Sequence, residues 1–586
     1  MLFIDESTIQ ELTVQDVLAY AKDSGVSVTV MQQFLTLVEG ERTTYAIAVL
    51  KAVSLLQEVQ IPVATHSLQA IVRVSKLKFH GTDGVRGVVV PAQETVALDL
   101  LAYQEHGLLS PNFCYLLVKA FLVLAREHGQ GGNLHLAIAE DGRDYTSGRA
   151  LVRSVAAAAR DTGYVVDYLG ILPTPGVAAY SLIHNQLAVM ITASHNPAKF
   201  NGIKCFIQGK KLYPEGVLGE YAISEQVFAY ALQSPNITLA PVPDVRQGGS
   251  NVLSEIILNC MTADDTNVLG HCSITIDCAN GAVSQCYQEI CDSLKLSYDV
   301  VNDSVNPGTI NKGCGAAVLE QYFQIPSKPP YLTSLIERMV EKSKESQVRQ
   351  YGLAVDGDGD RCMVVVLEPN AEYCTVLHGD EQILLLSERF TAVQQLAITI
   401  ESDPGTKAML SSRFPERMVH VKGVGDRYLR YGMEDSVLLG AEDSGHVIFP
   451  VPMKDGSCLY SGNGLLTGLL VIGAFHRGLT MPFVRLGVHK TVVRPIDRKH
   501  WYEGSPLYEE MRKVLTRELL DMQLVRFPED MDMLVCSYDT NSLLYIRASG
   551  TEPKMQFVCP DVPDLRLERV AQAFKKACAP YQIQEY

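Results

Sequence analysis

The sequence predicts an α/β protein of three blocks, with a helical segment before them and a smaller α+β unit after them. Continuously apolar, strand-like runs alternate with helical segments, and this alternation restarts twice along the chain, which favours mainly parallel sheets. The length of 586 residues corresponds to about four compact units of roughly 150 residues. We expect the chain to divide into a helical segment and four domains, over residues 1–78, 79–245, 246–366, 367–485 and 486–586.

The segment before residue 79 is predicted to be helical. Apolar residues such as Val49, Leu50, Val53 and Leu56 recur there at spacings of three and four. The segment contains no glycine-rich loop and no carboxylate cluster. We therefore expect it to pack on the rest of the chain, or to contact a protein partner or a second copy.

The later elements follow in order from residue 79. The first block has predicted strands over residues 134–139, 164–169 and 187–191, with an alanine-rich helix over 147–162. The second block starts with a strand over 273–278, an Asn280-Gly281 turn and a helix from about Ala282, and the third starts with a strand over 395–400. From about residue 486, strands alternate with two helices, which is typical of an α+β domain.

Charge and composition exclude several classes of protein. The formal net charge is −16, so bulk charge does not favour binding to nucleic acid or to an anionic membrane. The fourteen cysteines are scattered without a C-x-x-C pair, which favours a reduced, cytoplasmic setting. The beginning of the chain has no signal-peptide pattern, and the longest apolar stretch, near residues 464–475, is too short to span a bilayer.

A serine follows the predicted strand that ends at Ile191, in the sequence Thr-Ala-Ser-His-Asn-Pro. Ligands of open α/β sheets bind at the carboxyl ends of strands, and the turn at Asn196 is expected to expose Ser194. His195 and Lys204 offer groups for proton transfer. For this motif alone, an ordinary polar turn remains the alternative. A hydrolase triad does not fit, because adjacent serine and histidine side chains usually point apart.

Three aspartates alternate with glycines in Asp-Gly-Asp-Gly-Asp-Arg, which follows a predicted strand ending at Val355. Carboxylates at this spacing can converge on one hard cation. An EF-hand loop is excluded because Arg361 and Leu367 stand where glycine and glutamate are needed. A phosphatase motif of the D-x-D-x-[TV] kind is disfavoured by Asp360. The motif predicts a metal site, with a solvated acidic turn as the alternative.

Three further loops contain groups that suit a sugar or a phosphate. Residues 440–446 place Glu442 and Ser444 between glycines, as acceptors for paired sugar hydroxyls. Residues 547–554 follow a strand and combine an arginine, two hydroxyls and a glycine in a potential anion cradle. Residues 81–87 form a glycine-rich loop with Arg86. Each of these loops alone could be an ordinary turn.

Together, a hydroxyl nucleophile, a metal loop, a diol-binding loop and a phosphate cradle are the parts needed for phosphoryl transfer on a sugar phosphate. From residue 79 to residue 586 the chain resembles the α-D-phosphohexomutase superfamily, with all four loops in the order of that family. The resemblance implies four domains around a cleft: three related α/β domains with mixed sheets and a C-terminal α+β domain. Here a helical N-terminal extension precedes them.

The resemblance also implies roles for individual residues. Ser194 would be the phosphorylated residue, and Mg²⁺ would bind it together with Asp356, Asp358 and Asp360. The residues expected near the transferring phosphoryl group are Arg86, His195, Lys204 and Arg361. Those expected to bind the substrate are Glu442, Ser444, His446, Gly425, Asp426, Arg547, Ser549, Gly550 and Thr551.

The implied reaction moves a phosphoryl group between C1 and C6 of a hexose phosphate, through phosphoserine and a sugar 1,6-bisphosphate that also serves as activator. Residues 81–87, 311–315 and 424–428 resemble phosphoglucosamine mutases, so that activity is the expected one. The loop at 547–554 is more similar to phosphomannomutases and phosphoglucomutases, which are the alternative. Gly423 and His378 also depart from the phosphoglucosamine mutase pattern. A catalytically silent relative that binds a sugar phosphate is a further alternative.

Overall fold

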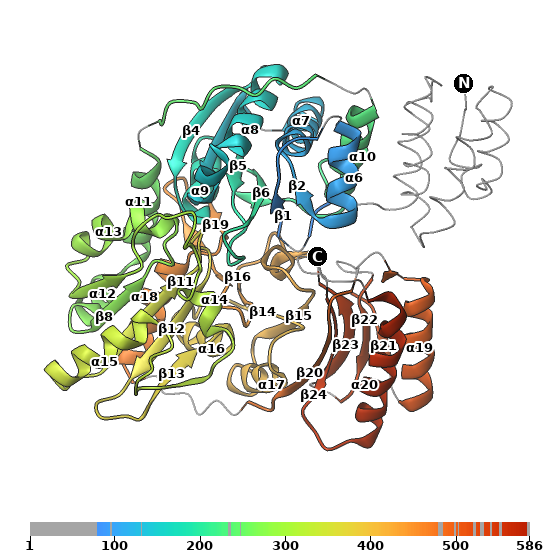
Figure 1. Cartoon of the computed structure of the whole chain (residues 1–586). Helices are drawn as coiled ribbons and strands as arrows, with labels where there is room; N and C mark the ends of the chain where they lie inside the picture. The colour runs from blue at the N-terminus through green and yellow to red at the C-terminus, as the bar shows by residue number, and fades with distance from the viewer. Residues whose placement is uncertain are drawn as a thin grey trace, which may run out of the picture.

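A computed structural model describes most of the chain from residue 79 onward (Figure 1). The described residues are 79–81, 83–93, 96–130, 132–232, 236–246, 248–478, 485–496, 500–501, 503–519, 523–527, 532–539, 542–549 and 554–582. The helical segment expected over residues 1–78 lies outside the described residues, as do Gly550 and Thr551.

The first block contains a seven-stranded mixed sheet in the order β2-β1-β6-β5-β3-β4, with β7 paired to β6. Its strands are β1 (Val85–Val89), β2 (Leu108–Leu109), β3 (His135–Glu140), β4 (Val165–Ile171), β5 (Leu187–Ile191), β6 (Phe200–Ile207) and β7 (Lys210–Lys211). β3 pairs in parallel with β4 and β5, whereas β6 runs antiparallel to β1 and β5. The carboxyl ends of β3 and β5 therefore lie at the same edge of the sheet.

Helices cover both faces of this sheet. They are α6 (Val96–His106), α7 (Pro111–Glu127), η1 (Arg143–Ser147), α8 (Ala150–Thr162), α9 (Thr174–Ile183), α10 (Glu220–Leu232) and α11 (Gly249–Cys260). Because strand side chains alternate between faces, Leu187 and Val189 of β5 join the core under α6, α7, α8 and α10. Ala188 and Met190 join the opposite core, under α9 and α11.

The second block contains a six-stranded sheet in the order β10-β13-β12-β11-β8-β9. Its strands are β8 (Ser273–Asp277), β9 (Tyr298–Val301), β10 (Gln324–Pro326), β11 (Gln350–Val355), β12 (Cys362–Leu367) and β13 (Tyr373–Leu377). Its helices are α12 (Ala263–Leu269), η2 (Ala282–Gln285), α13 (Tyr287–Ser293), α14 (Ala316–Leu319) and α15 (Ser334–Ser346). β11 pairs in parallel with β8 and antiparallel with β12, so the expected metal loop connects two adjacent antiparallel strands.

The third block has a four-stranded sheet in the order β15-β14-β16-β17 and a separate pair, β18 with β19. The strands are β14 (Gln395–Thr399), β15 (Met418–Lys422), β16 (Leu438–Ala441), β17 (Val447–Ile448), β18 (Val451–Pro452) and β19 (Cys458–Leu459). The helices are α16 (Gly379–Arg389), α17 (Pro404–Arg413), η3 (Asp426–Arg430) and α18 (Gly464–His476). α18 contains the longest apolar stretch of the sequence and is almost entirely buried. Among the described helices, none combines the length and the apolar composition needed to cross a bilayer.

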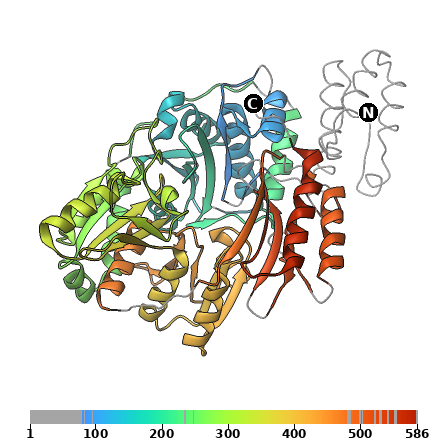
Figure 2. The same ribbon diagram turned by 60° about the horizontal axis from the view of Figure 1, so that its bottom comes forward.

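The fourth block is an antiparallel five-stranded sheet in the order β20-β24-β23-β22-β21. Its strands are β20 (Val488–Val493), β21 (Leu524–Val525), β22 (Leu534–Ser537), β23 (Leu543–Ala548) and β24 (Met555–Pro560). Figure 2 shows α19 (Pro506–Glu518) and α20 (Leu565–Cys578) on one face of this sheet, and a short turn η5 (Ala579–Tyr581) follows them. On the other face, Tyr545 and Val558 pack with Ile400 and Val424 of the third block.

The first three blocks share one hydrophobic core. It joins Met190 of the first sheet, Leu353 of the second and Leu396 of the third, with α18 buried among them. The predicted fold class is confirmed in three α/β blocks and an α+β block. The expectation of mainly parallel pairing is wrong for the first two sheets, because β6, β12 and β13 enter them antiparallel.

Candidate active site

Ser194 lies just beyond β5, at the carboxyl edge of the first sheet. Its φ is +51°, a left-handed conformation that non-glycine residues adopt only when their surroundings impose it. The Ser194 amide donates to Thr192 Oγ1 at 2.8 Å, and the Ser194 hydroxyl donates to Asp356 Oδ2 at 2.6 Å. The structure thus brings the expected nucleophile into contact with the expected metal loop.

The expectation that the Asn196 turn exposes Ser194 is wrong. The side chain is fully buried, because the loop between β11 and β12 covers it from the second block. A sequence motif predicts a turn but not what packs on that turn from a distant segment. The hydroxyl is therefore held in a low-dielectric site, in which hydrogen bonds and charges act more strongly than in water.

The metal loop connects β11 to β12 and is anchored by two helix starts. The amide of Thr174, at the start of α9, donates to the Asp358 carbonyl at 2.9 Å, and its hydroxyl donates to Asp358 Oδ2 at 2.6 Å. The amide of Gly464, at the start of α18, donates to the Gly359 carbonyl at 2.9 Å. Gly359 has φ +70°, so glycine is needed for the turn between the aspartates.

The three aspartates fit a hard divalent cation. Asp356, Asp358 and Asp360 are buried, and each offers a carboxylate oxygen within 4.8 Å of the others. Oδ1 of Asp358 and Oδ1 of Asp360 are buried and find no hydrogen-bond donor among the described residues. Burial, followed by the negative charges of Asp358 and Asp360, raises the pKa of Asp356 to about 8. Oxygen donors with excess negative charge are the ligands that Mg²⁺ prefers.

Lys204 stands beside these carboxylates on β6. Its Nζ lies 2.8 Å from Asp358 Oδ2, from Asp360 Oδ2 and from Asp83 Oδ2. Burial alone would lower the pKa of Lys204, but the three aspartates outweigh it and raise that pKa well above its ordinary value. Lys204 is therefore a fixed cation and not a group that exchanges protons near neutral pH.

A second lysine joins the first block to the third. Lys211 Nζ lies 2.7 Å from Asp83 Oδ1 and 2.9 Å from the Asp426 carboxylate. Burial would raise the pKa of Asp426, but His446 and Lys211 lower it well below its ordinary value. Asp83 of the glycine-rich loop is thus shared by Lys204 and Lys211. These contacts connect the loop at 81–87 with the candidate metal and sugar loops.

The remaining residues expected near the phosphoryl group gather around Ser194. Arg86 donates to Asp83 Oδ2 at 2.6 Å and to Asn196 Oδ1 at 3.1 Å. Arg361 Nε lies 3.9 Å from Asp356 Oδ2. Burial, followed by the charges of Arg361 and Arg86, lowers the pKa of His195 well below its usual value. His195 is therefore a neutral imidazole at physiological pH, and a neutral imidazole can accept a proton.

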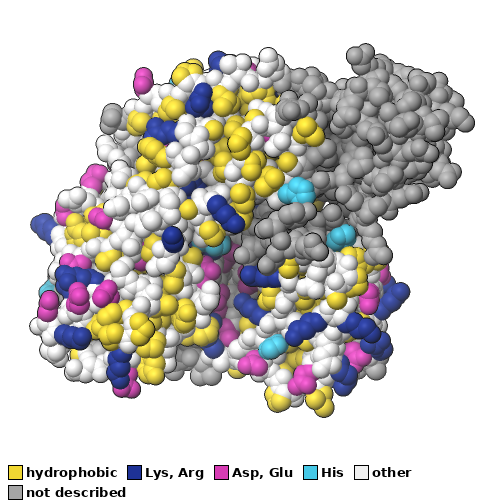
Figure 3. All heavy atoms as spheres, viewed as in Figure 1, with side chains coloured by type: hydrophobic (Ala, Val, Ile, Leu, Met, Phe, Trp, Pro, Cys, Tyr) yellow, Lys and Arg dark blue, Asp and Glu magenta, His cyan; other side chains and the backbone are white. Residues whose placement is uncertain are grey.

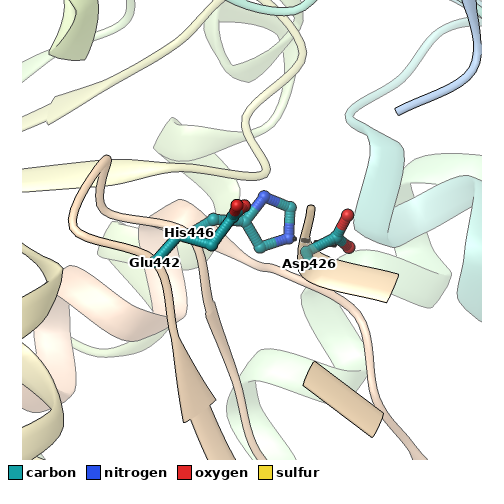
Figure 4. Close-up of side chains that lie close together, drawn as sticks. All are labelled: Asp426, Glu442 and His446. Carbon is teal, nitrogen blue, oxygen red and sulfur yellow. Dashed lines mark ion pairs between the residues drawn. The ribbon is translucent and has the colours of Figure 1, made fainter. Parts of the chain in front are cut away.

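The candidate sugar loop turns between β16 and β17. Figure 4 shows Glu442 and His446 from this turn close to Asp426. Glu442 Oε1 accepts from the Gly425 amide at 2.9 Å, and His446 Nε2 lies 3.1 Å from Asp426 Oδ2. Burial raises the pKa of Glu442. Ser444 is half-buried in the same turn. The structure thus brings these expected substrate residues together.

The expected phosphate loop belongs to the fourth block. Arg547 is the penultimate residue of β23, and its Nη1 lies 3.7 Å from Glu401 Oε1 of the third block. Ser549, just beyond the strand, is buried. Figure 3 shows a hollow between the fourth block and the rest of the molecule, with acidic side chains in its floor. Arg547 and Ser549 come from a different block than Ser194, as a cleft between blocks requires.

Several residues that support this site were missed by sequence reasoning: Asp83, Asp141, Arg143, Thr174, Lys211, Asn311 and Glu320. A signal existed for Arg143 and Thr174, because each follows the end of a strand at the same sheet edge as Ser194. No local pattern marks Lys211 or Glu320.

Two family models match the chain. The phosphoglucomutase/phosphomannomutase model for α/β/α domain I matches residues 77–232, and the model for α/β/α domain III matches residues 378–482. These matches cover the first block with Ser194 and the third block with Glu442.

Curated relatives are similar over most of the chain. A phosphoglucosamine mutase of Syntrophomonas wolfei is 29% identical over 511 residues, which are 85% of this chain and 98% of the relative. A phosphoglucosamine mutase of Symbiobacterium thermophilum is 30% identical over 508 residues, 84% of this chain and 97% of the relative. A solved phosphoglucomutase/phosphomannomutase family protein of Burkholderia thailandensis has a similar fold, with a TM-score of 0.59 and 18% identity. That match covers 86% of this chain and 97% of the Burkholderia protein.

Proposed function

Because this chain belongs to the α-D-phosphohexomutase superfamily, we propose that it moves a phosphoryl group between the C1 and C6 oxygens of glucosamine phosphate. Membership makes the protein a phosphohexomutase, an isomerase that acts by intramolecular phosphoryl transfer. Glucosamine is the proposed sugar because both curated relatives described above carry the name phosphoglucosamine mutase.

One observation carries the proposed mechanism. The buried Ser194 hydroxyl donates to Asp356 at 2.6 Å, within a loop whose three carboxylates fit a divalent cation. We assign the phosphorylated residue to Ser194, and the Mg²⁺ ligands to Asp356, Asp358, Asp360 and Ser194. When bound, Mg²⁺ would supply positive charge beside the phosphoryl oxygens.

The chain's own residues perform the remaining tasks. In one half-reaction the bond between phosphorus and Ser194 Oγ breaks while a bond between phosphorus and a sugar oxygen forms. In the other half-reaction the bond to a sugar oxygen breaks and the bond to Ser194 Oγ forms. Neutral His195 accepts the proton that the attacking hydroxyl releases and passes a proton to the oxygen that leaves phosphorus, so each half-reaction ends with as many protons as it began with. Arg86, Arg361 and Lys204 stay cationic and stabilise the negative charge of the group in transit.

Sugar and phosphate recognition is assigned to the other two loops. Glu442, Ser444 and His446 would orient the sugar hydroxyls, with Gly425 and Asp426 beside them. Arg547, Ser549, Gly550 and Thr551 would hold the phosphate that is not being transferred. A hexose 1,6-bisphosphate would act as intermediate and as activator, because it can phosphorylate Ser194. A cytoplasmic location stays a prediction.

A side-by-side mutase assay tests the proposal. Purified protein with Mg²⁺ and a trace of glucose 1,6-bisphosphate receives the 1-phosphates and 6-phosphates of glucosamine, glucose and mannose. A kcat/KM at least tenfold higher for glucosamine phosphate is the expected result. Preference for glucose or mannose phosphate would instead identify a phosphomannomutase/phosphoglucomutase, which the sequence at residues 547–554 favours. Inactivity on all six, with Ser194 phosphorylated, would indicate a sugar-phosphate-binding protein without turnover.

A further inference from the structure

The carbonyl oxygen of Ser194 is held by two buried side chains, which we call the carbonyl clamp: Arg143 and Asn311. Arg143 Nη2 donates to this oxygen at 2.7 Å, and Asn311 Nδ2 donates to it at 2.7 Å. Arg143 follows β3 in the first block, whereas Asn311 belongs to the loop between β9 and α14 in the second block. The peptide of the expected nucleophile is therefore held from two blocks at once.

On the side of the first block, the clamp closes a ring of hydrogen bonds. Arg143 Nε donates to Asp141 Oδ2 at 2.8 Å, and the Thr192 hydroxyl donates to the same oxygen at 2.6 Å. Thr192 Oγ1 in turn accepts from the Ser194 amide at 2.8 Å. Both the amide and the carbonyl of Ser194 are thus fixed. This ring explains how a non-glycine residue keeps a φ of +51°.

On the side of the second block, Asn311 acts through its side-chain nitrogen, Nδ2. Nδ2 also lies 3.2 Å from the carbonyl oxygen of Asn196, at the far side of the turn. Two carbonyl oxygens can be contacted favourably only by a donor, so the nitrogen of the carboxamide must face them. The position of Asn311 is itself fixed, because its backbone N–H donates to the Ala279 carbonyl at 3.0 Å.

The metal loop rests directly on the clamp. A side chain at Gly357 would begin 2.9 Å from Arg143 Nη2 and 3.0 Å from Asn311 Nδ2. Gly357 stands between Asp356 and Asp358, so the same two side chains contact the backbone of the metal loop and the backbone of Ser194. The clamp therefore sets the separation between the serine hydroxyl and the carboxylates.

We propose that Arg143 and Asn311 are positioning residues for phosphoryl transfer, which fix the orientation of Ser194 Oγ toward the metal loop. The inference rests on the proposed function of Ser194 as the phosphorylated nucleophile. Because Asn311 comes from the second block, Ser194 is fully positioned only when the first and second blocks are docked. A displacement of about 1 Å at a reacting atom can reduce the rate roughly 100-fold.

The test uses the full chain with two substitutions at Asn311. Asn311→Asp keeps the size of the side chain but turns an oxygen toward two carbonyl oxygens, and Asn311→Ala removes the contact. We expect kcat to fall by about 10- to 100-fold in both variants, while KM changes by less than about threefold. The rate at which glucose 1,6-bisphosphate phosphorylates Ser194, followed by mass spectrometry, should fall with kcat.

Lys312→Ala is the matched control, because Lys312 is exposed on the same loop and should leave kcat and the melting temperature unchanged. A folded Asn311→Asp variant with wild-type kcat would overturn the inference. The inference would also be overturned if both Asn311→Asp and Asn311→Ala failed to fold, because Asn311 would then act on stability alone. If the wild-type protein has mutase activity and the variants match it, only the clamp fails. If the wild-type protein neither turns over nor phosphorylates Ser194, the proposed function fails as well.

Discussion

Ser194 is completely buried and also has a left-handed backbone conformation. Both follow from contacts made by residues outside its own turn, since Asp356 covers the hydroxyl and Arg143 and Asn311 hold the carbonyl. The backbone is thereby shaped before substrate arrives, and preorganised geometry of this kind costs little at the moment of reaction.

At the scale of single residues, Ser194→Ala should abolish mutase turnover. The substitution removes the oxygen that would carry the phosphoryl group but leaves the backbone contacts of Ser194 in place. The melting temperature should therefore change by only a few degrees. Turnover of glucosamine 6-phosphate and incorporation of phosphate into the protein are the measurements, and normal activity in this variant would contradict the phosphoserine mechanism.

Asp358→Asn should reduce activity at least tenfold at saturating substrate and raise the Mg²⁺ concentration needed for half-maximal rate. It removes a charge from the candidate metal site and weakens the contact with Lys204. A Mg²⁺ titration of activity measures both effects. Glu372→Gln, on the exposed β12–β13 hairpin, is the control. An unchanged rate with unchanged Mg²⁺ dependence would show that Asp358 is not a ligand.

Residues that form one contiguous motif could be predicted from the sequence, and residues that meet only after folding could not. Asp356, Asp358 and Asp360 alternate within one loop, so their convergence follows from spacing alone. Arg143 and Asn311 lie 51 and 117 positions from the serine they hold. Arg143 follows a strand at the same sheet edge as Ser194, but no local pattern shows that either side chain reaches the carbonyl oxygen of Ser194. Their role depends on which sheet edges are adjacent, which is a property of the tertiary structure.

At the scale of secondary-structure elements, the carboxyl end of β3 contains a buried acidic residue, Glu140. Glu140 is fully buried, accepts a hydrogen bond from Tyr168 and lies 3.2 Å from Arg149 Nε. Burial raises the pKa of Glu140 to about 7, from an ordinary value of 4.5. Between these two pH values the folded protein keeps a proton that the unfolded chain has released. The folded state therefore loses stability as the pH rises through this window.

Glu140→Gln should remove that pH dependence. Between pH 5 and pH 7.5, the free energy of unfolding of the wild type should fall by up to about 3 kcal/mol more than that of the variant. Melting temperatures at the two pH values measure the difference, with the exposed Glu127→Gln on α7 as control. Parallel pH profiles for wild type and Glu140→Gln would show that Glu140 does not retain its proton.

For strands and helices, prediction succeeded where a hydrophobic pattern was strong. β5 begins and ends where expected, β8 and β14 each end one residue earlier than expected, and β3 is shifted by one residue at both ends. The direction of pairing was harder, because an apolar run buried on both faces looks the same in a parallel or an antiparallel strand. β12 is such a run, and it follows β11 through a tight loop that only an antiparallel partner allows.

At the scale of the whole molecule, Asp403 is one of the residues that attach the fourth block to the third. Its carboxylate accepts from the Leu486 amide at 2.9 Å and the Gly487 amide at 2.8 Å, where the chain enters that block. It also accepts from the Gly405 amide at 2.7 Å, at the start of α17. One side chain thus ties the third block to the block that contributes Arg547.

Asp403→Ala should loosen this attachment. We expect KM for the sugar phosphate to rise severalfold, with a smaller change in kcat, because the proposed phosphate loop is then less firmly placed over the other blocks. Limited trypsin digestion should release a C-terminal fragment that begins near residue 486 faster than in wild type. Asp435→Ala, at an exposed position of the third block, is the control. Identical KM and digestion rates would contradict this role.

The backbone conformation of Ser194 also limits which nucleophiles this scaffold could ever use. Threonine is β-branched and strongly disfavoured at a φ of +51°, so the other aliphatic hydroxyl amino acid is not a ready replacement. The residues that tolerate this conformation best are glycine, asparagine and aspartate, and none of them has a hydroxyl. A substitution of Ser194 by threonine is therefore strained, which closes the direct route from a phosphoserine to a phosphothreonine enzyme.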